Sequence, residues 1–520
     1  MYRRRDVLKL AAAGLSLPAG SFLFPAAAAA QTAVDAAASQ LSSGPFDPAK
    51  VVDLARAMSK QPQRKLPLDL PESIQNLNFE QYAAIRRVPE TNIWTNVKTG
   101  FAIEPMHRGF IFSSPMQLFT VEDGSVQRIN YDPTQFTFGK ITPPTAPKEF
   151  GFAGFRILQT GSGGTREAAV FYSAGFYQTI ARGQTPGVAA RGLSIRTADT
   201  QKEEFPNFIA AWIERPVLAA NLVVIHALLD SESVTGAYRF TFRPGEMTIV
   251  DTECTLFPRV AIDHYGLGTM QGTYLYGPIE RRRSDDVRPG VYDVSGLAML
   301  SGQNEWIWRP VANRQNLQVS AFVDENPRGF GFLQRDRDFA SFMDDDQHWE
   351  QRPSLWIEPI GDWGQGWVTL LEIPAESQTN QNIVAYWRSR AGLVAGTEPA
   401  FAYRQFWCWT PPNRPPYAIA AKSRSGRVPG APANAKRRRF QIEFTGDVLG
   451  DETLSPGVTP KASASTGSIV AVRFVLVRAQ KAMRVTLDVD AGNDALCELR
   501  LLLESGGKPV SETWLYRWTP

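Results

Sequence analysis

The chain has 520 residues, of which 43% are hydrophobic and 21% charged, and its formal net charge is +3 at pH 7. A chain of this length and composition can bury a large core and has room for more than one domain. A net charge this close to zero gives no reason to expect binding to nucleic acid, so we expect no nucleic-acid partner.

The N-terminal residues fit a twin-arginine export signal. Two arginines, a variable residue, a large apolar residue, leucine and lysine occur in order in Arg4-Arg5-Asp6-Val7-Leu8-Lys9. Residues 10–25 are apolar but diluted by glycine and proline, which disfavours a membrane-spanning helix, and small residues at 26–30 offer a cleavage site. We therefore predict a signal peptide at 1–30, the twin-arginine translocase as partner during export, and a periplasmic mature protein.

The three cysteines, Cys254, Cys408 and Cys497, lie far apart and show no metal-ligand spacing. A protein exported in the folded state must be stable without disulfides, so we expect buried free thiols. The four histidines are scattered, and no phosphate-binding loop or H-E-x-x-H motif is present. We expect no metal and no organic cofactor.

In chain order, the first predicted element is a helix after Asp47, with Asp47 as N-cap and Pro48 at its first position. A second short helix is expected at 79–86. Beyond it, alternating apolar and polar runs bounded by turn residues predict strands at 238–243, 247–251, 317–322 and 367–373. So many strands with so few helices predict an all-β fold, with one large antiparallel β-sandwich over 31–395.

The composition changes after residue 395. Prolines at 411–416 and a Ser-, Gly-, Pro- and Ala-rich stretch at 423–435 indicate a linker and loop over 396–435. Short strand patterns then recur at 440–444, 469–477, 485–489, 498–503 and 513–518. They predict a second, immunoglobulin-like β-sandwich over 436–520.

The chain is rich in aromatic residues, with 13 Trp, 14 Tyr and 30 Phe. A large β core accounts for many of them. Carboxylates among aromatic side chains are also typical of the active sites of glycoside hydrolases. There, one carboxylic acid protonates the leaving oxygen, and a second carboxylate activates water or attacks the sugar itself.

Several dense motifs resemble the periplasmic glucan biosynthesis proteins G and D, which act on osmoregulated periplasmic glucans. The resemblance covers nearly the whole chain after the signal, and the twin-arginine signal favours the D branch. The motifs that carry it are Ala190-Arg191-Gly192-Leu193, Glu203-Glu204-Phe205-Pro206, Trp306-Ile307-Trp308-Arg309-Pro310, Asn326-Pro327-Arg328-Gly329, Arg352-Pro353-Ser354-Leu355-Trp356 and Gly361-Asp362-Trp363-Gly364.

The resemblance implies a large β-sandwich of the galactose-mutarotase type joined to an immunoglobulin-like domain, with a cleft for β-1,2-linked glucan. It also implies inverting glycoside hydrolysis, or transfer of the glucan chain, with Asp293 as base. The chain departs from the family pattern at two places. Gln381 stands where the family has its acid, and Trp349 stands where it has a tyrosine that relays protons.

These two departures leave two functions open, a hydrolase or transglycosylase with a non-standard acid and a non-catalytic glucan-binding or assembly protein. Glu372 and Glu358 are candidate substitute acids, and Glu358 is also a candidate sugar contact. Arg309, Arg328 and Arg352 are expected to bond sugar hydroxyls or to form salt bridges, and Tyr386 is a further candidate sugar contact. The candidate sugar platforms are among Trp306, Trp308, Trp356, Trp363 and Trp387, some of which are expected in the core. We expect β-1,2-glucan as ligand, other glucan biosynthesis proteins as possible partners, and either a monomer or a dimer.

Overall fold

The computed structural model describes residues 38, 41–161, 164–280, 285–432, 436–453 and 457–520. The predicted signal at 1–30 lies outside these residues. In the described part 48% of the residues are in β-strands and 10% in helices, and the helices are short, so the predicted all-β class is confirmed.

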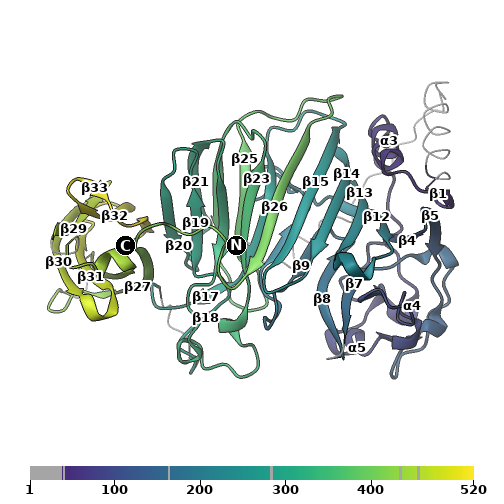
Figure 1. Cartoon of the computed structure of the whole chain (residues 1–520), viewed down its shortest axis with the longest axis horizontal. Helices are drawn as coiled ribbons and strands as arrows, with labels where there is room; N and C mark the ends of the chain where they lie inside the picture. Colours follow the sequence, from purple (N-terminus) through teal and green to yellow (C-terminus); the bar gives the residue numbers. More distant parts are fainter. Residues whose placement is uncertain (1–37, 39–40, 162–163, 281–284, 433–435, 454–456) are drawn as a thin grey trace.

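The larger sheet has 16 strands among the described residues and runs along the length of the molecule (Figure 1). In spatial order its strands are β1 (Gly44–Pro45), β5 (Ser125–Ile129), β4 (Gln117–Glu122), β12 (Asn207–Glu214), β13 (Val223–Asp230), β14 (Val234–Arg243), β15 (Thr248–Pro258), β26 (Ala400–Cys408), β23 (Ser354–Ile360), β22 (Gly329–Leu333), β19 (Gly296–Leu300), β20 (Trp306–Pro310), β34 (Thr513–Trp518), β32 (Cys497–Ser505) and β29 (Val458–Ala464), and β33 (Lys508–Pro509) pairs with β32.

A second sheet, with 10 strands in the described chain, covers one face of the first. Its strands are β21 (Gln318–Glu325), β24 (Gln365–Glu372), β25 (Ile383–Ser389), β16 (Tyr265–Gly272), β10 (Ala189–Arg191), β9 (Phe176–Thr179), β8 (Gly164–Tyr172), β7 (Gly154–Gly161) and β3 (Phe101–Met106), and β11 (Ser194–Ile195) pairs with β16. Two small pairs lie outside it, β17 (Tyr274–Tyr276) with β18 (Val291–Tyr292) and β2 (Arg86–Arg87) with β6 (Phe136–Thr137).

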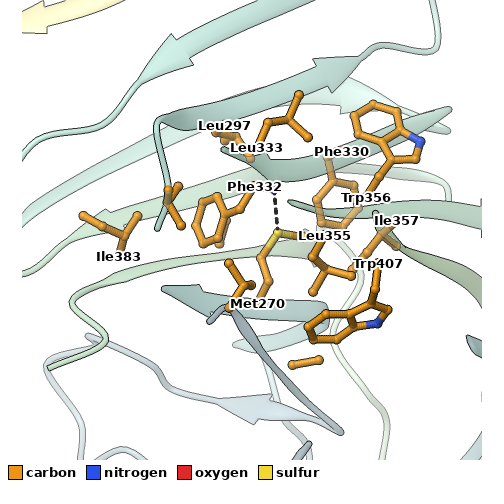
Figure 2. Close-up of a cluster of buried hydrophobic side chains, with 14 of the residues drawn as sticks. Met270, Leu297, Phe330, Phe332, Leu333, Leu355, Trp356, Ile357, Ile383 and Trp407 are labelled. Carbon is orange, nitrogen blue, oxygen red and sulfur yellow. Dashed lines mark hydrogen bonds between the residues drawn. The ribbon is translucent and has the colours of Figure 1, made fainter. Parts of the chain in front are cut away.

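Apolar side chains fill the space between the two sheets, as the alternating strand patterns require. Figure 2 shows Met270 of β16 among Phe330 and Phe332 of β22 and Leu355 of β23, all of them buried. The backbone N–H of Phe332 points at the Met270 sulfur, 3.1 Å away. This contact joins the two layers and confirms the predicted sandwich.

The C-terminal residues form a second two-layered unit. One layer is a four-stranded sheet of β27 (Ile419–Arg427), β28 (Arg437–Thr445), β31 (Ala482–Asp490) and β30 (Ser468–Val477). The other layer is β34, β32 and β29, which the parallel pair β20–β34 joins to the large sheet. Phe440 and Trp514 pack between these layers, and both are fully buried. The unit is thus hydrogen-bonded to the sandwich and is not only tethered to it.

The predicted linker at 396–435 is wrong in two places. Residues 400–408 form β26, which lies between β15 and β23 in the middle of the large sheet. Residues 419–427 form β27 of the C-terminal unit. The prolines at 411–416 mark only the connection between these two strands, because proline interrupts sheet pairing without preventing strands on either side.

The α-helices that lie wholly within the described residues are α3 (Pro48–Ser59), α4 (Glu72–Gln75) and α5 (Phe79–Ala83). The carboxylate of Asp47 accepts a hydrogen bond from the N–H of Ala49 at 2.9 Å, which confirms the predicted cap. The second predicted helix is confirmed but ends at Ala83 rather than 86. None of the helices in the described ranges is long and apolar enough to cross a membrane.

Candidate functional site

Asp293 follows β18 directly, and its side chain is buried. Its Oδ1 accepts a hydrogen bond from the backbone N–H of Thr273 at 2.6 Å, and Arg352 Nη1 lies 3.6 Å from its Oδ2. Burial raises the pKa of Asp293, and the positive charge of Arg352 opposes that rise. A carboxylate with a raised pKa accepts a proton at a higher pH than a free aspartate does, which suits a base.

Thr273, which follows β16, connects Asp293 to the segment that contains Gln381. Its N–H bonds Asp293, and its Oγ1 donates to the carbonyl of Asn380 at 3.2 Å. Two segments that are far apart in the sequence therefore meet at one threonine.

The side-chain amide of Gln381 is engaged at both ends. Its Oε1 accepts from Gln271 Nε2 at 2.5 Å, and its Nε2 donates to the Gly187 carbonyl at 3.1 Å. An amide can donate a hydrogen bond but cannot deliver a proton to a leaving oxygen. At the position where the resemblance implies a general acid, this chain has a glutamine held in place by protein groups.

The orientation of both glutamine amides follows from Arg191. Arg191 Nε donates to Gln271 Oε1 at 2.9 Å, and its Nη1 pairs with Glu203 Oε1 at 2.8 Å. Because a guanidinium only donates, Gln271 must turn its oxygen to Arg191 and its NH2 to Gln381. Gln381 therefore presents its oxygen to Gln271.

Trp349 packs beside Arg352, whose guanidinium carbon lies 4.0 Å from the indole centroid. Its Nε1 donates to Asp344 Oδ2 at 2.9 Å, and Arg288 Nη1 donates to the same oxygen at 2.5 Å. Burial alone raises the pKa of Asp344, but the hydrogen bonds from Arg288 and Trp349 outweigh it and leave the pKa below its ordinary value. Asp344 is buried, and its lowered pKa makes it a poor acid.

The structure thus brings together four of the residues that the sequence singled out: Asp293, Gln381, Trp349 and Arg352. With Thr273 and Gln271, which join them, we call this group the Asp293 site.

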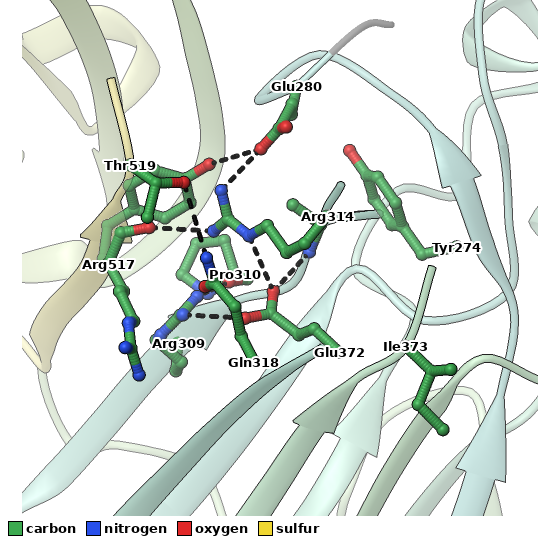
Figure 3. Close-up of polar contacts among 12 residues, drawn as sticks. Tyr274, Glu280, Arg309, Pro310, Arg314, Gln318, Glu372, Ile373, Arg517 and Thr519 are labelled. Carbon is green, nitrogen blue, oxygen red and sulfur yellow. Dashed lines mark hydrogen bonds and ion pairs between the residues drawn. The ribbon is translucent and has the colours of Figure 1, made fainter. Parts of the chain in front are cut away.

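Glu372 and Arg309 lie elsewhere, in a buried ion-pair network at the junction with the C-terminal unit (Figure 3). Glu372 Oε2 lies 3.1 Å from Arg309 Nη2, and its Oε1 accepts from the N–H of Ala312 at 2.7 Å and lies 3.6 Å from Arg314 Nε. Arg314 also pairs with Glu280 at 2.6 Å. Both carboxylate oxygens of Glu372 are committed, so its placement does not support a substitute acid, and Arg309 forms a salt bridge rather than a sugar contact.

The candidate sugar platforms are buried. Trp306 stacks on Trp356 with ring centroids 5.5 Å apart, Trp308 lies under the Arg335 guanidinium at 3.6 Å, and Trp363 packs edge-on against Tyr403. Each of the three is at most 7% exposed. None has an open face for stacking on a sugar, so their burial does not support that role.

Tyr386 is 1% exposed, and its hydroxyl lies 2.8 Å from His264 Nε2. His264 Nδ1 lies 2.6 Å from an oxygen of Asp199, which as a carboxylate accepts the proton. Burial raises the pKa of Tyr386. The tyrosine therefore fastens the loop that contains Asp199 to β25 and offers no surface to a sugar.

The last two predicted contacts also lie outside the Asp293 site. Arg328 is exposed, and its backbone N–H bonds Leu300. Glu358 accepts hydrogen bonds from Trp356 Nε1 at 3.0 Å and Asn413 Nδ2 at 2.5 Å.

Sequence reasoning missed Gln271, Thr273 and Gly187 as parts of the site, and recognised Arg191 only as part of a family motif. Gln271 and Thr273 follow a run interrupted by Gly266 and Gly268, where no alternating pattern is clear. A glutamine and a threonine carry no catalytic signature of their own, so only their contacts reveal them.

All three cysteines lie in the described chain, where they are free and buried, as predicted. Within the described ranges, no group of three or more His, Cys, Asp or Glu side chains is arranged to hold a metal ion.

Fold and site together define a class of protein: a large all-β sandwich in which a buried aspartate, an arginine and a tryptophan meet where strands of the smaller sheet end. The chain belongs to the family of periplasmic glucan biosynthesis proteins named MdoG, whose family model matches residues 46–518. The recognition made from the motifs is confirmed, and the protein is periplasmic, as predicted.

Curated relatives match over most of their length. The chain is 41% identical to glucans biosynthesis protein G of Shewanella baltica (strain OS195) over 480 residues, which cover 92% of this chain and 88% of that protein. It is 40% identical to the protein of the same name from Shewanella sp. (strain MR-4), over 96% of this chain and 92% of that one. The protein G of Vibrio cholerae serotype O1 (strain ATCC 39541) is also 40% identical, with 92% and 87% covered. These relatives carry the G name, so membership of the D branch stays a prediction.

Proposed function

We propose that the protein binds the β-1,2-linked backbone of periplasmic glucan at the Asp293 site during glucan synthesis. The family supports the role in glucan synthesis, and the resemblance of its motifs supports the linkage. Arg352, whose Nε has no hydrogen-bond partner among the described residues, offers a donor for sugar hydroxyls, and Asp293 holds its guanidinium in place.

The observation that favours binding over hydrolysis is that the Gln381 amide is hydrogen-bonded to Gln271 and to the Gly187 carbonyl. Inverting hydrolysis needs a carboxylic acid to protonate the leaving oxygen. Among the described residues, the Asp293 carboxylate is paired with Arg352 and with the N–H of Thr273, and neither is a carboxylic acid. The nearby Asp344 has a lowered pKa.

A second candidate function is catalysis, with Asp293 as base in hydrolysis or transfer of the glucan chain. The raised pKa of Asp293 favours it, because a base works best when its pKa lies near the working pH. This function needs a proton donor other than Gln381.

One experiment separates the two functions. The purified protein is titrated with linear β-1,2-glucan in a calorimeter, and the chain lengths of the glucan are followed by chromatography over days. We expect saturable binding and unchanged chain lengths, with affinity at least about tenfold weaker in Arg352→Gln because a charged hydrogen bond is lost. Arg328→Gln, an exposed arginine outside the site, is the matched control and should bind normally.

New chain lengths that disappear in Asp293→Asn would establish catalysis and overturn the binding-only function. The absence of any binding to β-1,2-glucan, or equal binding to linear β-1,3-glucan, would overturn the proposed ligand.

We also propose export by the twin-arginine translocase, on the N-terminal motif. Replacing Arg4 and Arg5 together with lysine should leave the protein in the cytoplasm, whereas Arg3→Lys should be exported normally. Cell fractionation and immunoblotting measure both, and export of the double variant would contradict the proposal.

A further inference from the structure

A pocket with about 600 Å³ of empty space, part of it open to solvent, lies at the junction of the large sandwich and the C-terminal unit. Tyr274, Tyr292 and Trp308 line it from the sandwich, and residues 421–424 of β27 line it from the C-terminal unit. None of the residues that line it belongs to the Asp293 site. The pocket is therefore a separate feature of the molecule.

Two exposed cations on β27 line this pocket. Lys422 and Arg424 are two residues apart on one strand, so their side chains lie on the same face. Both are exposed, and the side chain of neither forms a hydrogen bond or ion pair with any residue of the described chain. Glu443, the cross-strand neighbour of Lys422, is instead held by Arg484 at 2.8 Å.

Most arginines on the neighbouring strands are neutralised, which sets Lys422 and Arg424 apart. Arg439 and Arg473 both bond Asp488, with contacts of 2.6 and 2.5 Å. Two adjacent cations without carboxylate partners attract an anion, and they do so more strongly beside a low-dielectric wall of aromatic rings.

The sandwich wall adds groups that can form hydrogen bonds with the hydroxyls of a sugar. Asp336, which also lines the pocket, lies 3.3 Å from the Tyr292 hydroxyl and can accept from a further donor. Tyr274 is 2% exposed, and its hydroxyl has no hydrogen-bond partner among the described residues. Figure 3 shows this hydroxyl apart from the Glu280–Arg314 pair. A buried hydroxyl without a partner is costly, and a bound ligand can relieve that cost.

We infer that this pocket binds a sugar residue that carries an anionic group such as a phosphate ester. The cations alone would take a bare anion, but Asp336 would repel one. A ligand that presents hydroxyls to Asp336 and an anionic group to Lys422 and Arg424 forms favourable hydrogen bonds with both sides of the pocket.

The inference is tested on the full-length protein by calorimetric titration with glucose 6-phosphate, glucose and inorganic phosphate. We expect glucose 6-phosphate to bind more tightly than either of the other two and to weaken as salt is added, because exposed charges are screened. The double variant Lys422→Gln/Arg424→Gln should lose at least about tenfold in affinity, since charged hydrogen bonds are the stronger ones. Tyr274→Phe should bind less tightly than the parent protein.

Arg427→Gln is the matched control, because Arg427 is an exposed cation on the same strand outside the pocket. It should bind glucose 6-phosphate as the parent does. Absence of saturable binding, unchanged affinity in the double variant, or inorganic phosphate binding as tightly as glucose 6-phosphate would each overturn the inference. All variants should bind linear β-1,2-glucan like the parent, so failure here is distinguishable from failure of the proposed function.

Discussion

The side-chain oxygen of Gln381 accepts a hydrogen bond from Gln271 Nε2 at 2.5 Å. Arg191 fixes the direction of that bond, because it donates to the oxygen of Gln271. The position where the resemblance implies an acid is therefore occupied by an amide whose two ends are already bonded. The first prediction follows from this amide at the acid position.

Replacing Gln381 with aspartate should introduce hydrolysis of linear β-1,2-glucan. The new carboxyl group would lie on the segment that Thr273 joins to Asp293 and could supply the missing proton, and general acid catalysis contributes roughly 10²–10⁴-fold in rate. The products are measured by chromatography. Gln381→Asn, which has the same size as aspartate but no acid, is the control.

The same variant combined with Trp349→Tyr should be faster than Gln381→Asp alone if a hydroxyl at position 349 relays the proton. Equal inactivity of Gln381→Asp and Gln381→Asn would show that more than the acid has been lost from this site.

Gly187→Ala should weaken glucan binding. A Cβ at Gly187 would lie 2.9 Å from Arg352 Cβ and 3.0 Å from its Cδ, so the arginine side chain would have to shift away from Asp293. Overpacking of this kind costs about 1–3 kcal/mol of stability. Calorimetric binding and thermal unfolding measure the two effects.

Gly426→Ala is the control for this substitution, because nothing lies within 4 Å of a Cβ at that position. If Gly187→Ala and Gly426→Ala bind glucan equally well, Arg352 does not contribute to binding through its present position.

Glu372→Gln should destabilise the fold strongly without changing the affinity for glucan. Glu372 and Arg309 are each 1% exposed in their side chains, and breaking a buried pair leaves an uncompensated charge, which costs about 3–5 kcal/mol. Urea denaturation measures the free energy of unfolding.

The matched control is Asp447→Asn, which removes an exposed ion pair with Lys481 and should leave stability unchanged. A Glu372→Gln variant that is as stable as the parent but has lost glucan binding would show that Glu372 contributes to the glucan-binding site.

The stability difference between the parent and Asp293→Asn should depend on pH. Because burial raises the pKa of Asp293 in the folded state, the folded protein holds this proton more tightly than the unfolded chain does. Its stabilising contribution is complete below the unfolded pKa of about 3.9 and is lost as pH rises through the folded value.

The asparagine variant should therefore gain stability relative to the parent as pH rises from about 4 through the folded pKa. Thermal unfolding of both proteins from acid to neutral pH measures this difference. A difference that is constant over the range, or that shrinks with rising pH, would contradict the raised pKa.

The sequence alone determined the all-β class, the capped helix after Asp47, most strands of the C-terminal unit and the family. These features are local, because strand alternation and helix caps are written in residues that are neighbours in the chain. The motifs also singled out Asp293, Gln381, Trp349 and Arg352, all of which meet in one site. The structure of residues 396–435 could not be predicted from local patterns, because the partners of β26 are β15 and β23, which lie far away in the sequence.

Only the tertiary structure decided which side chains face one another. Alternation along β20 and β24 cannot say that Arg309 pairs with Glu372, nor that Trp306 stacks on Trp356 in the core. Gln271 and Thr273 became part of the site because strand pairing brings β16 beside β25. Pairings between distant segments depend on how whole layers pack, and no pattern within a single segment records them.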